Sequence, residues 1–104
     1  RVLFRSATLD RASFATLDRV VAVARSCPNA KVEIEGHTDS EGAPDRNQRL
    51  SDRRAQAVVE YLVNAGVDRA RLKAVGYGET RPLAPNDSEA NRARNRRIEF
   101  TVRD

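Results

Sequence analysis

The stretch from Asn47 to Ala65 constrains the fold more than any other part of this sequence. An α-helix turns by about 100° per residue, so side chains three or four positions apart share one face. Read as a helix, the stretch collects on one face the apolar residues Leu50, Val58, Tyr61, Leu62 and Ala65. Arg54 falls near the middle of that face, between Leu50 and Val58. The pattern predicts an amphipathic helix from near Arg46 to Asn64, with an arginine on its buried side.

Strands are predicted where apolar and polar residues alternate. Every second residue is apolar in Lys31–Glu35 and in Arg97–Val102, as is typical of a strand with one buried face. The side chains predicted to face inward are Val32, Ile34, Ile98, Phe100 and Val102. Weaker patterns predict a strand over residues 1–5 with Val2 and Phe4 on one face, and a strand over residues 72–77.

Two further helices complete the predicted order of elements. One spans residues 11–25, with Asp10 as its N-cap and a buried stripe of Phe14, Leu17, Val21 and Ala24. The other is short, begins after Ser88 and reaches about Asn95. Strands that alternate with helices favour crossovers and partly parallel pairing. We therefore predict an α/β (α+β) two-layer sandwich, β-α-β-α-β-(short α)-β, with a mixed sheet and the helices packed on one face.

Arg54 requires a polar partner, because burying an isolated charge in an apolar environment is costly. A candidate is Asp39, in the loop that separates the strand Lys31–Glu35 from the predicted helix. We expect the two charges to flank a pocket for a small zwitterionic group, with Asp39 binding an ammonium and Arg54 forking onto a carboxylate. The alternative is that Asp39 and Arg54 form a structural ion pair with each other.

Length, charge and cysteine content bound the class of protein. A chain of 104 residues suits one compact domain, and it contains no apolar run of the roughly 20 residues that a membrane span needs. Because the chain begins with Arg and not Met, we expect it to be part of a longer or processed protein. Cys27 is the only cysteine and has no ligand-like spacing to His, so no metal site and no cofactor are predicted.

Three other features of the sequence have both a functional and a structural interpretation. The net charge is +4, and four arginines between Arg92 and Arg97 favour a nucleic-acid interface as one alternative. No aromatic residue interleaves with them, which argues against binding of single strands. His37 lies two residues before Asp39, but no nucleophile motif accompanies it, so a structural hydrogen bond at the strand end is expected. Glu33 and Glu35 are predicted to lie on the solvated face of the sheet.

Four segments together resemble one known family. GHTDSEG at 36–42, LSDRRAQAVVEYL at 50–62, GYGETRPLAPN at 76–86 and NRARNRRIEF at 91–100 are similar to the OmpA-like peptidoglycan-binding domain. That family includes the C-terminal part of outer-membrane protein A, the peptidoglycan-associated lipoprotein and the flagellar stator B protein. The resemblance covers nearly the whole chain, so it implies one domain over residues 1–104, excised from a longer envelope protein.

The resemblance implies a non-catalytic domain that holds cell-wall peptidoglycan without a covalent bond, on the periplasmic side of the outer membrane. Its partner would be the diaminopimelate residue of the stem peptide, and a homodimer or a pure interaction module is the alternative. The family's binding positions correspond here to Asp39, Arg54, Thr38, Asn47, Arg96 and Arg97. We expect one of Arg96 and Arg97 to face the pocket, and the resemblance leaves open which. The chain departs from the family at Asn91-Arg92, where Gly-Arg is usual.

Overall fold

The structure is a computed structural model of the 104-residue chain. It describes the backbone of residues 2–3 and 11–103 and the side chains of residues 15–103. The elements are, in order, β1 (Val2–Leu3), α1 (Arg11–Ser26), β2 (Lys31–His37), α2 (Pro44–Asn64), the 3₁₀ turn η1 (Arg69–Arg71), β3 (Leu72–Gly76), α3 (Glu89–Asn95) and β4 (Arg97–Arg103). The predicted Asp10 cap and the predicted packing of Phe4 and Phe14 lie outside the described residues.

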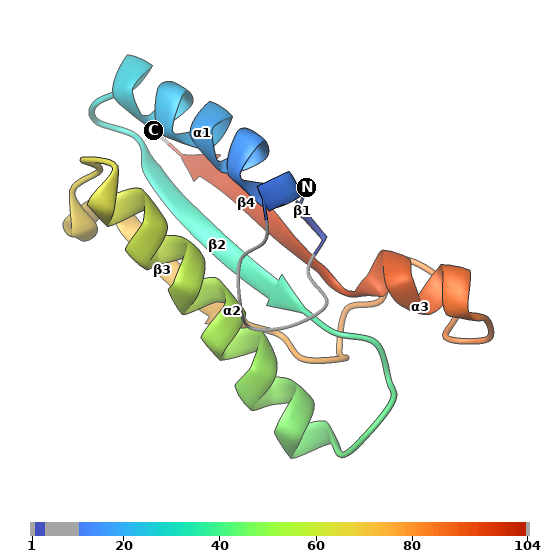
Figure 1. The fold of residues 1–104 in the computed structure, drawn as a ribbon. Coiled ribbons are helices and arrows are strands. Elements are labelled where there is room, and N and C mark those ends of the chain that lie inside the picture. Colours follow the sequence, from blue (N-terminus) through green and yellow to red (C-terminus); the bar gives the residue numbers. More distant parts are fainter. Residues whose placement is uncertain (1, 4–10, 104) are drawn as a thin grey trace.

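The four strands form one mixed sheet in the order β1-β4-β2-β3. β2 pairs in parallel with β3 and antiparallel with β4, while β1 pairs antiparallel with the start of β4. α1 and α2 lie side by side on one face of this sheet, and α3 stands at one end beside the segment that joins β2 to α2 (Figure 1). The predicted two-layer α/β arrangement is confirmed, and the η1 turn is an element that the sequence patterns did not indicate.

The core lies between the two long helices and the sheet. It is built from side chains that are at most 7% exposed, principally Leu17, Val21, Ala24, Val32, Ile34, Ala55, Val58, Val59, Leu62, Val67 and Ile98. The predicted inward directions of Val32, Ile34 and Ile98 are therefore confirmed. Val102 lies opposite Val32 and therefore faces the predicted side, but it is 46% exposed and does not belong to the core. It borders a hollow between α1 and β4.

The buried face of α2 differs from the predicted one in its detail. Its buried residues are Asn47, Ser51, Arg54, Ala55, Val58, Val59 and Leu62. Leu50 and Tyr61 lie only at the margin of this face. The apolar pattern predicted burial of Leu50 and Tyr61. The close approach of α2 to the sheet instead buries the small residues Ser51 and Ala55. The helix also begins earlier than predicted, at Pro44. Proline is favoured in the first turn of a helix, because amide groups there have no partner within the helix and its missing N–H costs no hydrogen bond.

Two glycines allow this close approach. A Cβ added to Gly36 in β2 would collide with the backbone carbonyl oxygen of Ser51 in α2. A Cβ added to Gly76 in β3 would collide with the Asp52 carboxylate and the Ser51 hydroxyl. The Ser51 hydroxyl in turn accepts a hydrogen bond from the Gly78 amide at 2.9 Å. These contacts fix the first half of α2 against the ends of β2 and β3, where the polar residues gather.

Candidate functional site

The loop after β2 presents Asp39 in a fixed orientation. The Thr38 amide donates to the carbonyl of Gly78 at 2.8 Å, which continues the bonding of β2 beyond its end. The Thr38 hydroxyl donates to the carbonyl of Asp39 at 2.9 Å. The Asp39 side chain then accepts a hydrogen bond from the Glu41 amide at 3.1 Å, in a tight turn that Asp side chains favour. Thr38 and Asp39 are only 3% and 7% exposed.

Asn47, in the first half of α2, holds the same loop from the other side. Its side-chain amide donates to the carbonyl of Glu41 at 2.9 Å and to the carbonyl of Asp39 at 3.3 Å. Asn47 is 5% exposed, so these bonds satisfy a buried side-chain amide. The predicted neighbourhood of Asn47 and Asp39 therefore exists, and Asn47 acts within it as a support for the loop backbone.

Arg54 is buried close to Asp39 and Arg96. Its side chain is among the largest fully buried ones described, with 2% exposure. Burial lowers the pKa of the Arg54 guanidinium below its ordinary value, the positive charge of Arg96 lowers it further, and the carboxylate of Asp39 raises it. Arg54 therefore lies within electrostatic range of the Asp39 carboxylate and the Arg96 guanidinium, and these three residues form what we call the Asp39 cluster.

Arg96 reaches this cluster from the turn between α3 and β4. Its guanidinium donates from Nη1 to Asp39 Oδ2 and from Nη2 to Glu89 Oε1, both at 2.7 Å. The hydrogen bond to Glu89 is the largest cause that raises the pKa of Arg96, and the bond to Asp39 adds to it. Among the described residues, the ion pair of Asp39 is thus with Arg96 rather than with Arg54.

Arg97 points away from this cluster. In the register of the sheet it lies opposite His37, on the face that the helices do not cover. Its guanidinium donates to the carbonyls of Arg81 at 2.9 Å and Asn95 at 3.2 Å, and its Nη2 lies 3.4 Å from Glu99 Oε2. The structure therefore gathers five of the six predicted site residues and directs Arg97 elsewhere.

Asn95 explains why Arg96 is held in place. It is fully buried, and its side-chain oxygen accepts hydrogen bonds from the amides of Leu83 and Ala84 at 2.7 and 3.1 Å. Its side-chain nitrogen donates to the carbonyl of Ala84 and to the side chain of Asn86, both at 2.9 Å. These four bonds attach the loop before α3 to the turn that carries Arg96. Ser88 caps α3 as predicted, by accepting from the Asn91 amide.

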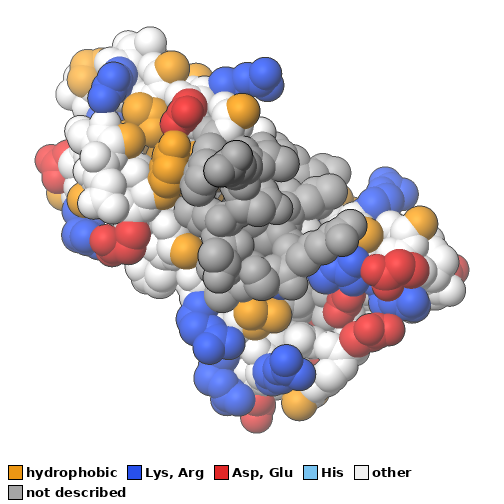
Figure 2. All heavy atoms as spheres, in the orientation of Figure 1, with side chains coloured by type: hydrophobic (Ala, Val, Ile, Leu, Met, Phe, Trp, Pro, Cys, Tyr) orange, Lys and Arg blue, Asp and Glu red, His pale blue; other side chains and the backbone are white. Residues whose placement is uncertain are grey.

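The charges around α3 are mixed rather than uniformly basic. Arg92 Nε lies 3.1 Å from Glu41 Oε1 and 3.4 Å from Glu89 Oε2, and Arg96 is paired as described above. Figure 2 shows basic and acidic side chains interleaved at this end of the molecule. A surface that binds a phosphate backbone presents a continuous patch of positively charged side chains. The arrangement argues against the nucleic-acid alternative for Arg92–Arg97.

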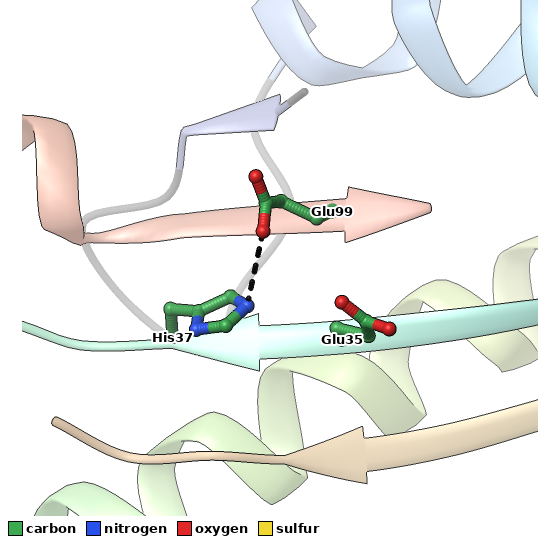
Figure 3. Close-up of side chains that lie close together, drawn as sticks. All are labelled: Glu35, His37 and Glu99. Carbon is green, nitrogen blue, oxygen red and sulfur yellow. Dashed lines mark ion pairs between the residues drawn. The ribbon is translucent and has the colours of Figure 1, made fainter. Parts of the chain in front are cut away.

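The uncovered face of the sheet carries a second cluster, formed by Glu35, His37 and Glu99 (Figure 3). His37 is 1% exposed; its Nε2 lies 3.4 Å from Glu99 Oε2, and its ring stacks on Tyr77 with centroids 5.4 Å apart. Burial raises the pKa of the Glu35 carboxyl above its ordinary value, as do the hydrogen bond and charge of Glu33. Glu33 and Glu35 lie on the predicted face, but both are partly buried rather than fully solvated.

Sequence patterns alone did not identify Glu89 or Ser51 as members of the site region. Glu89 is an exposed acid in a short helix, and nothing in its local sequence indicates that it pairs with Arg96. Ser51 is fully buried, although serine in a helix is usually exposed. The helical spacing of Asn47, Ser51 and Arg54 is the signal that could have found it, because it outlines a polar buried stripe.

Two surface hollows lie away from the Asp39 cluster. One, of about 300 Å³, is lined at the opposite end of the sheet by residues that include Lys31, Lys73 and Arg103. The other, of about 170 Å³, lies between α1 and β4 and includes Val20, Val23 and Phe100. No charged residue that lines either hollow is buried. Asp39 and Arg54 are 7% and 2% exposed, so the Asp39 cluster is the better candidate for recognition of a small charged group.

Comparison with known proteins relates the chain to one family. The model of the OmpA family matches residues 3–96. Outer membrane porin F of Pseudomonas fluorescens is 55% identical over 75 residues, which cover 72% of this chain and 23% of the porin. Peptidoglycan-binding protein ArfA of Mycobacterium tuberculosis is 41% identical over 96 residues, which cover 92% of this chain and 29% of that protein. The chain thus spans less than a third of the length of either relative.

A solved structure has the same fold. The crystal structure of the peptidoglycan-associated lipoprotein from Burkholderia pseudomallei superposes with a TM-score of 0.92 at 32% sequence identity. The superposition covers 98% of this chain and 88% of that one. Within the described ranges, no helix has the length and apolar character that crossing a membrane requires.

Proposed function

The chain belongs to the OmpA family, and on that basis we propose that it binds peptidoglycan without a covalent bond, through the diaminopimelate residue of the stem peptide. The observation that carries the proposal is the buried cluster in which the carboxylate of Asp39 lies with the guanidinium groups of Arg54 and Arg96. Such a cluster offers one anionic and two cationic partners at the same end of the sheet. The names of the relatives support cell-wall binding as the general role.

Diaminopimelate carries an ammonium and a carboxylate on one carbon, which matches this pattern of charge. The ammonium would bind the Asp39 carboxylate, whose Oδ1 already accepts from the Glu41 amide. The carboxylate would bind Arg54 in a bidentate fork, because a planar guanidinium matches the spacing of two carboxylate oxygens. Lysine at the same position of a stem peptide lacks that carboxylate and would leave the buried Arg54 without its anionic ligand.

Arg96 determines how the ligand enters. Its side chain is 19% exposed and its Nη1 holds Asp39 Oδ2 at 2.7 Å, so an incoming ammonium must share or replace this contact. Glu89 lies on the solvent side of Arg96 and is 67% exposed, so it offers Arg96 a second partner while Asp39 turns to the ligand. We infer that Arg96 moves toward Glu89, or forks onto the ligand carboxylate, when diaminopimelate binds.

The biological role that fits this binding is anchorage. The domain would attach an envelope protein to the cell wall on the periplasmic side of the outer membrane and would not cleave its ligand. The relatives named above include an outer membrane porin and a peptidoglycan-binding protein, of which a chain of this length is a minor part. We propose that residues 1–104 are likewise one domain of a longer envelope protein.

Co-sedimentation with purified sacculi tests the proposal. Asp39→Asn and Arg54→Met should each weaken retention by about tenfold to hundredfold, as expected when a hydrogen bond to a charged group is lost in a buried site. Arg53→Met is the matched control, because Arg53 is the adjacent arginine and is exposed on α2. Sacculi that contain lysine in place of diaminopimelate should bind more weakly, and free diaminopimelate should compete with sacculi.

Two outcomes would overturn the assignment. If Asp39→Asn and Arg54→Met sediment as well as Arg53→Met, the cluster is not the binding site. If the unchanged domain binds both kinds of sacculi equally, diaminopimelate is not the recognised group. Incubation with sacculi should release no soluble muropeptides, and their release would instead indicate an enzyme.

A further inference from the structure

The strongest unassigned feature is the cluster on the uncovered face of the sheet. Glu35 and His37 are two residues apart in β2, so their side chains emerge on the same face. The antiparallel register with β4 sets Glu35 directly opposite Glu99. Each of the three residues offers one ligand atom, and these atoms all lie within 4.8 Å of one another. Figure 3 shows the three side chains together, two from β2 and one from β4.

The spacing of these atoms suits a small divalent cation. In a tetrahedral site with metal–ligand distances of about 2.0–2.2 Å, neighbouring ligand atoms are about 3.3–3.6 Å apart. His37 Nε2 and Glu99 Oε2 are already 3.4 Å apart. The third ligand, from Glu35, has to approach by a small change of its side-chain rotamer. Glu35 and Glu99 are both partly exposed, which gives a cation a route from solvent.

The surroundings orient the ligands as a metal site requires. The His37 ring stacks on Tyr77, and the Arg81 guanidinium covers the Tyr77 ring at 3.8 Å from its centroid. The Thr101 hydroxyl lies 3.3 Å from Glu35 Oε2 and helps to orient this carboxylate. Supporting contacts of this kind fix ring and carboxylate orientation around bound metals.

We propose that Glu35, His37 and Glu99 form a binding site for a first-row divalent transition-metal cation such as Zn²⁺. One imidazole and two carboxylates match the donors that Zn²⁺ accepts, whereas Ca²⁺ and Mg²⁺ prefer oxygen ligands only. Three protein ligands leave a fourth position for water or for a group from a partner. The site lies on the face opposite α1 and α2, and it is independent of the Asp39 cluster.

Among the described residues, Arg97 competes with a metal for Glu99. Its Nη2 lies 3.4 Å from Glu99 Oε2, a distance at which the pairing is weak. The same guanidinium is held by the carbonyls of Arg81 and Asn95, so it keeps two partners when Glu99 turns to a metal. Binding of a metal to Glu99 therefore replaces the long contact with Arg97 and leaves Arg97 held by these two carbonyls.

Titration of a tag-free domain with Zn²⁺ tests the proposal, in a Cys27→Ser background because Cys27 is exposed and could bind metal itself. Calorimetry should give saturable one-to-one binding. Glu35→Gln and Glu99→Gln should each weaken it by about tenfold or more, since even supporting residues of metal sites contribute that much. Glu60→Gln is the control, because Glu60 is an exposed glutamate of α2, on the opposite face of the sheet, and it should bind Zn²⁺ like the parent.

A second readout does not depend on any substitution. His37 is the only histidine of the sequence, so the imidazole signals in an NMR spectrum belong to it alone. They should shift with one equivalent of Zn²⁺ and broaden with paramagnetic Co²⁺. The proposal is wrong if binding does not saturate, if Glu35→Gln and Glu99→Gln bind like Glu60→Gln, or if the His37 signals do not respond. Asp39→Asn should bind Zn²⁺ like the parent. A negative result in the zinc test therefore leaves the sacculus test unaffected, and the reverse also holds.

Discussion

The two halves of α2 are buried by different means. In the first half, from Pro44 to Arg54, the buried side chains are those of Asn47, Ser51 and Arg54. In the second half, from Ala55 to Asn64, they are Ala55, Val58, Val59 and Leu62. One continuous helix therefore has a polar buried stripe over the ends of β2 and β3 and an apolar one over the body of the sheet.

The difference separates stability from recognition. The second half buries apolar side chains, which is the main source of folding free energy. The first half approaches the sheet closely at Gly36 and Gly76, and it uses hydrogen bonds to keep buried polar groups satisfied. We infer that the apolar half supports the fold and that the polar half, which contributes less to stability, keeps charged groups in place for a ligand.

The largest expected effect on stability comes from the apolar half. Leu62→Ala removes a fully buried side chain and should lower the free energy of unfolding by about 2–5 kcal/mol, because a cavity is left in a packed core. Leu50→Ala is the control in the polar half, where Leu50 lies at the margin of the buried face, and it should cost clearly less. Urea unfolding measures both. Equal losses of unfolding free energy in Leu62→Ala and Leu50→Ala would contradict the inference that the apolar half of α2 supports the fold.

A steric test of the polar half should come next in size. In Gly36→Ala the added methyl group meets the backbone of Ser51, which cannot turn aside as a flexible side chain can. We expect a loss of about 1–3 kcal/mol, the usual consequence of overpacking, and weaker retention by sacculi because α2 is pushed away from the loop that holds Asp39. Thermal unfolding and co-sedimentation are the measurements. A variant as stable as the parent would show that α2 does not need this contact.

Replacement of Arg54 should leave stability nearly unchanged. Burial opposes the charged form of Arg54, and Asp39 keeps its ion pair with Arg96 when Arg54 is removed. Arg54→Met removes the cost of burying a guanidinium, and this gain offsets the contacts that the substitution loses. We expect Arg54→Met to unfold within about 1 kcal/mol of the parent and yet to lose sacculus binding. A loss of unfolding free energy as large as that of Leu62→Ala would show that Arg54 serves mainly to stabilise the fold.

The smallest effect is expected at the surface of the second half. Arg69 donates two hydrogen bonds to the Glu60 carboxylate, at 2.7 and 3.0 Å, but the two side chains are 58% and 54% exposed. Exposed ion pairs contribute little, so Glu60→Gln should lower the melting temperature less than any variant above.

The hydrogen bond from Arg69 lowers the pKa of Glu60 below its ordinary value of 4.5. The stabilisation by this pair is therefore complete above pH 4.5 and disappears as the pH falls through the lowered pKa of the folded state. Melting curves of the parent and of Glu60→Gln should differ slightly at pH 7 and converge in acid. A difference that grows in acid would contradict this assignment.

Much of the site could be predicted because it depends on local patterns. Helical spacing identified Arg54 as a charge on a buried face, and the position of Asp39 directly after a strand placed it at the sheet end. The choice between Arg96 and Arg97 could not be made this way. Arg96 occupies a turn that has no periodicity, and the direction of Arg97 depends on its pairing with His37 in β2.

By itself, the sequence determined the order of strands and helices, the mixed two-layer fold and the buried arginine of α2, because periodicity within one element fixes which side chains share a face. Only the tertiary structure decided which elements meet. It gave Asp39 an ion pair with Arg96, secured Arg96 through Glu89 and Asn95, and set Glu99 opposite Glu35. These contacts join residues far apart in the chain, and strand register and backbone packing, which local patterns do not encode, determine them.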